Sequence, residues 1–175
     1  KKKPQRRASD ATPEQKEGGA KRRVSNSIKL EAWQRDGFRS RLSRKRLIFP
    51  YALELLSLIL PDELPYPNPP NGPYDRTHSI MWELWPAVDH VIPVRNSTDT
   101  AIANRLDNLI TLSSLENLEK SSFDLGYLGW TLLPPEPLPD WDGLVSWYIQ
   151  YLEQDPSWFD HPTSGRKLKD WHLRL

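Results

Sequence analysis

A short stretch in the middle of the chain gathers side chains that could together hydrolyse a phosphodiester bond. Asp89 and His90 are neighbours in the apolar run 87–94, and Asn117 follows later in the chain. A neutral imidazole can take a proton from water, and a divalent cation can neutralise charge on the phosphate and the leaving oxygen. Hard cations such as Mg²⁺ prefer oxygen ligands and use one or two protein carboxylates. Asp89 and the Asn117 amide oxygen meet that requirement.

The elements that would position these groups follow one another in the order strand, loop, strand, helix. Asn108 opens a second apolar run at 109–112, and Asn117 falls in the first turns of the helix expected next. Neighbouring side chains on a strand point to opposite faces. Asp89 and His90 therefore reach one phosphate only if the strand is bulged or bent, or if they hold it from two sides, and we expect such a distortion. Taken alone, the Asp-His pair also fits a purely structural role.

The stretch from Ala87 to Lys120 resembles the HNH nuclease family, whose core is the ββα-metal fold. The signature is carried by Asp-His-Val-Ile-Pro at 89–93, by Asn-Leu at 108–109, and by Asn117 with Lys120 three residues on. The resemblance covers roughly residues 27–130. It implies an α+β fold with a ββα-metal core wrapped by additional helices on its N- and C-terminal sides.

The resemblance also implies a role for each residue of the signature. His90 would be the general base, and Asp89 and Asn117 would bind Mg²⁺ or Mn²⁺. Asn108 would brace the loop between the strands by bonding its backbone, and Lys120 would contact phosphate.

Many members of this family hold a structural zinc with two Cys-x-x-Cys turns, and this chain lacks all four thiols. The first turn would follow Arg35-Asp36-Gly37, where Ser40 and Ser43 stand instead, and the second would fall at Ser113 and Glu116. Serine hydroxyls are poor zinc ligands, and one glutamate cannot hold a tetrahedral site. We expect no structural zinc, so packing and hydrogen bonds must hold these turns.

Basic residues are unevenly distributed along a chain whose formal net charge is only +1. Residues 1–23 hold nine Lys or Arg against three Asp or Glu. This arm could lie along phosphates, with an affinity that falls with salt, or could be a solvated tail or linker. A second basic cluster is expected to bind nucleic acid, and the alternative is a solvated loop in which some charges pair with carboxylates elsewhere. Its members are Arg39, Arg41, Arg44, Lys45 and Arg46. Arg95 and Arg105 flank the loop between the strands and could also touch nucleic acid.

The pattern outside the signature predicts a helical protein with a basic arm. We expect an arm at 1–26, a nuclease domain at 27–130 and a helical extension at 131–175 that packs on it. Apolar spacing predicts helices over 28–35, 50–60 and from about 144 to 152, and a last helix that ends at 175. The chain has no cysteine and no apolar run near the ~20 residues that span a bilayer, so we expect a cytoplasmic protein without a membrane partner.

The sequence therefore favours a metal-dependent HNH endonuclease that acts on DNA, with RNA not excluded. Two alternatives stay open. One is a catalytically silent module, derived from such a nuclease, that binds nucleic acid or serves as a scaffold. The other is an effector subunit that is active only within a larger nucleoprotein or defence assembly.

Overall fold

Helices and a small antiparallel sheet form the described part of the chain, so the fold is α+β, as expected. The computed structural model describes residues 24–66, 77–94 and 99–175. Residues 1–23 of the expected basic arm and Arg95 lie outside these ranges, and Asn26, the last residue assigned to the arm, begins α1. The elements in chain order are α1 (Asn26–Arg35), α2 (Pro50–Ile59), α3 (Ile80–Leu84), β1 (Pro86–His90), α4 (Thr100–Ala103), the 3₁₀ turn η3 (Leu106–Asn108), β2 (Leu109–Ser113), α5 (Ser114–Lys120), α6 (Leu125–Leu128), α7 (Val145–Gln154), the 3₁₀ turn η4 (Pro156–Asp160) and α8 (Gly165–His172).

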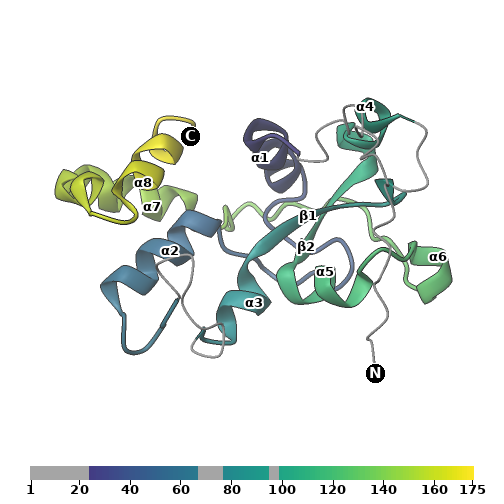
Figure 1. Cartoon of the computed structure of the whole chain (residues 1–175), viewed down its shortest axis with the longest axis horizontal. Coiled ribbons are helices and arrows are strands. Elements are labelled where there is room, and N and C mark those ends of the chain that lie inside the picture. Colours follow the sequence, from purple (N-terminus) through teal and green to yellow (C-terminus); the bar gives the residue numbers. More distant parts are fainter. Residues whose placement is uncertain (1–23, 67–76, 95–98) are drawn as a thin grey trace, which may run out of the picture.

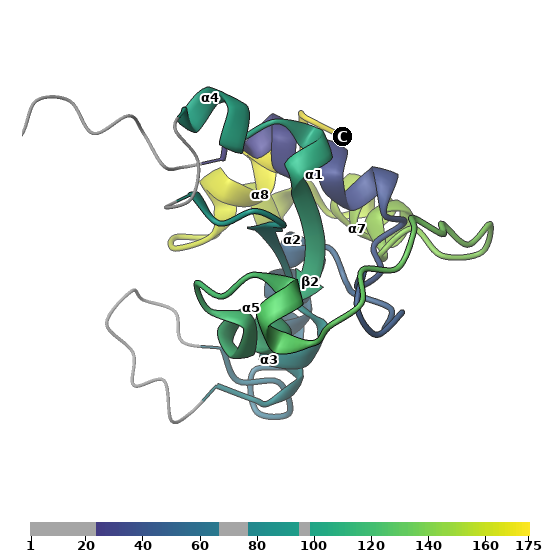
Figure 2. The same ribbon diagram turned by 90° about the vertical axis from the view of Figure 1, so that its right-hand side faces the viewer.

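The strands β1 and β2 form a hairpin that lies between α1 and α5 (Figures 1 and 2). The pairing runs from Pro86 opposite Ser113 to His90 opposite Leu109. The Thr111 hydroxyl donates to a carbonyl of α1, 3.2 Å away, so alternate residues of β2 face α1. The other face carries Ile110 and Asp89, and it is covered by α5, which begins directly after β2. The expected order of strand, loop, strand and helix is therefore present.

A second group of helices buries most of the aromatic side chains. Figure 1 shows α2, α7 and α8 together on the side of the molecule away from α6. The apolar stripe predicted from 144 to 152 lies on α7, where Tyr148 and Leu152 are fully buried. They pack with Phe49 before α2 and Trp171 of α8. The Tyr148 hydroxyl donates to the Leu168 carbonyl at 2.6 Å, and burial raises the pKa of this phenol. The helical extension is thus built into the main core.

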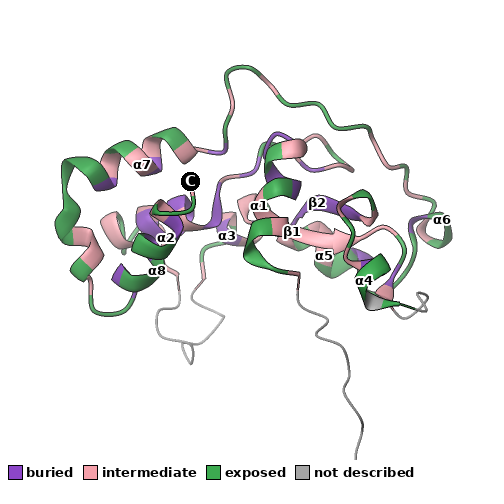
Figure 3. Ribbon diagram, turned by 90° about the horizontal axis from the view of Figure 1, so that it is seen from above, coloured by how far each residue is buried: buried purple, intermediate pink, exposed green. Residues whose placement is uncertain are grey.

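Residues 131–140, here called the connector, link α6 to α7. Figure 3 shows them as a long and largely exposed segment that passes alongside the hairpin and α1. Prolines at 134, 135, 137 and 139 favour an extended conformation. The connector joins the hairpin end of the molecule to the helices α7 and α8.

The turn that ends α1 depends on a glycine packed against the connector. Gly37 has a φ of +63°, and a Cβ placed there would lie within 3.0 Å of the Pro137 Cα. We expect Gly37→Ala to lower the free energy of unfolding by about 2 kcal/mol, because backbone strain and steric overlap add.

Gly129 provides the matched control for this substitution. It has a similar φ of +66°, but its Cβ would meet no heavy atom of the described residues within 4 Å. Gly129→Ala should therefore cost only the left-handed backbone penalty, about 1 kcal/mol. Urea denaturation of both variants measures the difference. An equal decrease in the free energy of unfolding would show that a Cβ at position 37 does not overlap with Pro137.

Within the described residues, no helix combines the length and the apolar character needed to cross a membrane.

Candidate active site

Asp89 and His90 lie at the end of β1, partly accessible to solvent. The Asp89 side chain is 19% exposed and the His90 side chain 12% exposed. The His90 Nδ1 atom lies 3.9 Å from the Asp89 Oδ1 atom. The imidazole and the carboxylate are therefore close enough to act on one small group.

The expected bulge is not what brings these two groups together. Every residue of β1 pairs with one residue of β2 in a continuous register, including Asp89 with Ile110 and His90 with Leu109. The continuous pairing rules out a bulge in β1, and the expected alternatives, a bent strand or contact from two sides, stay predictions. Because His90 is the last residue of the strand, its ring lies at the strand end, where one of its nitrogens comes within 3.9 Å of the preceding carboxylate.

Lys120 of α5 is buried against Asp89. Its Nζ atom lies 2.7 Å from the Asp89 Oδ2 atom, and its side chain is 1% exposed. The sequence predicted a phosphate contact for Lys120. In the folded chain its ammonium group is enclosed and bonded to a carboxylate, because burying a charge requires a partner of opposite sign. Lys120 neutralises and holds Asp89.

The same ion pair brings the Asn117 side of α5 toward β1. Residues three apart on a helix lie on one side of it, so Asn117 is one turn before Lys120 on the same side of α5. Asn117 is half-buried. The strand β1 with Asp89 and the helix α5 with Asn117 are in contact, and the shared metal ion stays a prediction.

Asn108 joins the two ends of the loop between the strands. Its Oδ1 atom accepts from the Ile92 backbone N–H at 2.9 Å. Its Nδ2 atom donates to the Ile92 carbonyl at 3.2 Å and to the Ala103 carbonyl at 2.9 Å. These are bonds to loop backbone of the kind expected for a brace. They fix the start of the loop just after His90.

Comparisons with known proteins give no relative. No family model, no curated protein and no solved structure matches the chain.

Asn104 is the site residue that the sequence reasoning missed. Its Oδ1 atom lies 2.9 Å from the Nε2 atom of His90. It directly follows α4, and no sequence motif singles out this position. Only the three-dimensional path of the loop between the strands brings it to the imidazole.

The basic cluster at 39–46, here called the basic loop, is turned toward its own chain. Three of its arginines bond to the connector. Arg39 donates to the Glu136 carbonyl at 2.9 Å, Arg41 donates to the Leu133 carbonyl, and Arg44 donates to the Pro134 carbonyl. These side chains hold the proline-rich segment in place.

The other two members of the basic loop pair with carboxylates. Lys45 lies 3.4 Å from Glu83, and Arg46 lies 3.5 Å from Asp140 and stacks over the Trp141 ring. All five side chains of the basic loop thus have partners within their own chain, and the prediction that they bind nucleic acid stays a prediction. Their partners lie far away in the sequence, which the local charge pattern does not reveal.

Arg105 remains on the surface near the loop between the strands. It lines a pocket of about 480 Å³ with Arg35, Leu106 and Asp107. Its guanidinium lies 3.1 Å from the exposed Asp107 carboxylate, in a pair that solvent weakens. The Arg105 side chain is therefore exposed to solvent, and its contact with nucleic acid stays a prediction.

Hydrogen bonds occupy the turns where cysteines would hold zinc. The Ser40 hydroxyl accepts from the backbone N–H groups of Leu42 and Ser43, at 3.1 and 3.2 Å. Ser113 and Glu116 form a capping box at the start of α5, in which each side chain bonds the other's backbone N–H. A local motif thus supports each turn.

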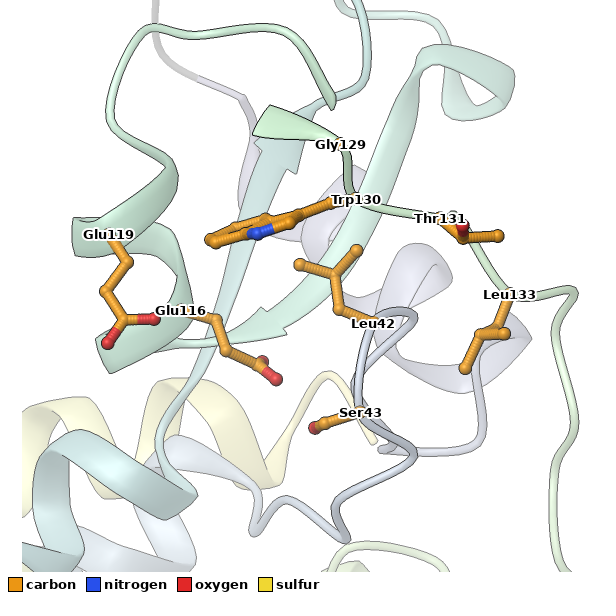
Figure 4. Close-up of a pocket in the computed structure, with 8 residues that line it drawn as sticks. All are labelled: Leu42, Ser43, Glu116, Glu119, Gly129, Trp130, Thr131 and Leu133. Carbon is orange, nitrogen blue, oxygen red and sulfur yellow. The ribbon is translucent and has the colours of Figure 1, made fainter. Parts of the chain in front are cut away.

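A pocket of about 410 Å³ lies between these two turns, lined on one side by Ser43 and on the other by Glu116. In Figure 4 the Trp130 ring lies between the loop that carries Leu42 and the helix that carries Glu119. Within the described ranges, no three His, Cys, Asp or Glu side chains are grouped to hold a metal ion. The metal site expected from the sequence has one carboxylate, Asp89, and one amide, Asn117, so it is not a group of this kind.

Asp36 connects the first of these turns to the hairpin. This buried carboxylate accepts from the guanidinium groups of Arg35 and Arg41, at 2.8 and 3.1 Å, and from the Thr111 backbone N–H at 2.9 Å. The sequence reasoning used Arg35-Asp36-Gly37 only as a landmark. In the structure the motif anchors α1 to β2.

Proposed function

We propose that this protein is a metal-dependent endonuclease of the HNH type that hydrolyses phosphodiester bonds in DNA. The observation that supports the proposal is the Lys120–Asp89 ion pair, because it ties α5, the helix that carries Asn117, to β1, the strand that ends at His90. In this proposal the His90 imidazole, the Asp89 carboxylate and the Asn117 amide would surround one point that is partly accessible to solvent.

The side chains fit a hard divalent cation such as Mg²⁺ or Mn²⁺. The Asp89 Oδ2 atom is bonded to Lys120, which leaves the Oδ1 atom, on the His90 side, as the ligand atom. The Asn117 amide oxygen would be the second ligand, and water and phosphate would complete the shell. When bound, the cation would stabilise negative charge on the phosphate and on the departing oxygen.

The protein's own contribution to the reaction is the transfer of a proton. His90 accepts a proton from a water molecule as the water oxygen forms a bond to phosphorus. The bond between phosphorus and the 3′-oxygen breaks, and that oxygen leaves with the bonding electrons. Asn108 fixes the loop that follows His90, so the imidazole keeps its position during the reaction.

A cleavage assay on supercoiled plasmid DNA tests this function. The full chain should nick or linearise the plasmid with Mg²⁺ or Mn²⁺, and an excess of EDTA should stop the reaction. Restoring Mg²⁺ should restore cleavage, which separates removal of the ion from unfolding. Cutting at an equal rate in EDTA would contradict the metal-dependent reaction.

One observation favours the second candidate, an effector subunit that needs a larger assembly. The basic loop, which was expected to bind nucleic acid, bonds instead to the connector and to carboxylates of its own chain. A partner would then supply the missing contacts to DNA. In the same assay this candidate predicts that the isolated chain leaves the plasmid intact at every metal concentration.

A further inference from the structure

The imidazole of His90 is held by an amide from the loop between the strands. The Asn104 Oδ1 atom lies 2.9 Å from His90 Nε2, and the other ring nitrogen, Nδ1, lies 3.9 Å from Asp89 Oδ1. The two ring nitrogens therefore face different neighbours. Asn104 meets one of them, and the carboxylate proposed as a metal ligand lies beside the other.

The chemistry of the amide determines which ring nitrogen carries the proton. An amide oxygen has lone pairs and no hydrogen, so it can only accept a hydrogen bond. The Nε2 atom of His90 must then carry the hydrogen, and in a neutral imidazole the free lone pair is on Nδ1. That lone pair lies on the Asp89 side of the ring, where a water would have to be activated.

Asn108 helps to hold Asn104 in this position through a hydrogen bond to the preceding residue. Its Nδ2 atom donates to the carbonyl of Ala103, the residue directly before Asn104, at 2.9 Å. The bond fixes the end of α4 relative to the start of the loop. Asn108 therefore helps place Asn104, and Asn104 in turn orients His90.

We propose that Asn104 is a positioning residue that fixes His90 in the tautomer with the hydrogen on Nε2 and the lone pair on Nδ1. The role in catalysis rests on the proposed nuclease function, whereas the tautomer itself does not. Asn104 contacts neither the phosphate nor the cation in this assignment, and it acts only through His90.

Nitrogen-15 NMR of the full chain with labelled histidine tests the tautomer without any cleavage. At a pH where the ring is neutral, His90 should show a protonated Nε2 and an unprotonated Nδ1. Asn104→Ala should give a mixture of tautomers. Asn104→Asp should retain the tautomer of the unaltered chain, because an ionised carboxylate can only accept. A hydrogen on Nδ1 in the unaltered chain, or its appearance in Asn104→Asp, would overturn the proposal.

Cleavage kinetics provide the second readout. Asn104→Ala should lower kcat by about 10- to 100-fold with little change in KM, as is usual for a residue that orients an active-site group. Asn104→Asp should recover most of that loss, and Asn26→Ala, at an exposed asparagine of α1, should cut at the normal rate. An Asn104→Ala chain with a normal kcat would overturn the positioning role. If the chain shows the expected tautomer and cuts no DNA, the inference about Asn104 and His90 stands and the proposed function fails.

Discussion

Replacing His90 with alanine is expected to lower the rate of DNA cleavage by about 10²- to 10⁴-fold, the usual loss on removing a general base. DNA binding should remain, because the imidazole would act on a water and not on the nucleic acid. The His90 side chain contacts Asn104 and belongs to neither buried apolar cluster of the described residues, so its truncation should leave the core packing unchanged. Plasmid cleavage with Mg²⁺ gives the rate, and fluorescence anisotropy in EDTA gives the affinity.

His161→Ala is the matched control for this variant. His161 lies between η4 and α8, next to the ring of Trp158, and it takes no part in the proposed site. It should cut at the normal rate. A His90→Ala chain that cleaves as fast as the His161→Ala chain would rule out His90 as the base.

Substituting methionine for Lys120 is expected to lower the free energy of unfolding by about 3 kcal/mol, because Asp89 would lose its buried counter-charge. The Nζ–Oδ2 distance of 2.7 Å and the 1% exposure of Lys120 make this a buried pair on the lysine side. Asp89→Asn should cost at least as much, since it leaves an enclosed ammonium without a carboxylate. Urea denaturation measures both values.

The double variant separates the ion pair from simple packing. Lys120→Met with Asp89→Asn should be more stable than the sum of the two single effects predicts, since neither charge remains unpaired. Lys45→Met is the exposed control: its pair with Glu83 spans 3.4 Å between side chains that are 37% and 48% exposed. That change should cost less than about 1 kcal/mol. Additive losses at positions 89 and 120 would show that their charges do not interact.

The elements of this fold could be read from local patterns. The apolar run at 87–94 and the one at 109–112 identified both strands, although the first strand ends at His90. The helical spacing from Leu144 to Leu152 identified the buried face of α7. These predictions succeed because the apolar residues on the buried face of a strand or helix recur at a fixed spacing in the sequence.

The pairing of charged side chains could not be read in this way. Arg39 and Glu136 are 97 positions apart, and Lys120 and Asp89 are 31 positions apart. Whether such a charge faces solvent or a distant carboxylate depends on the assembled fold. One missed signal was local: Ser113 and Glu116 have the spacing of a capping box, and we considered them only as positions of absent cysteines.

The arginine contacts along the connector have a consequence for protease resistance. An exposed, proline-rich segment between two helical parts looks like an easily nicked linker. A protease must draw several residues of extended backbone into its cleft, and here the carbonyls of Leu133, Pro134 and Glu136 are bonded to arginines of the basic loop. Cutting this segment would first require those bonds to open together, so the connector should survive digestion for longer than its exposure implies.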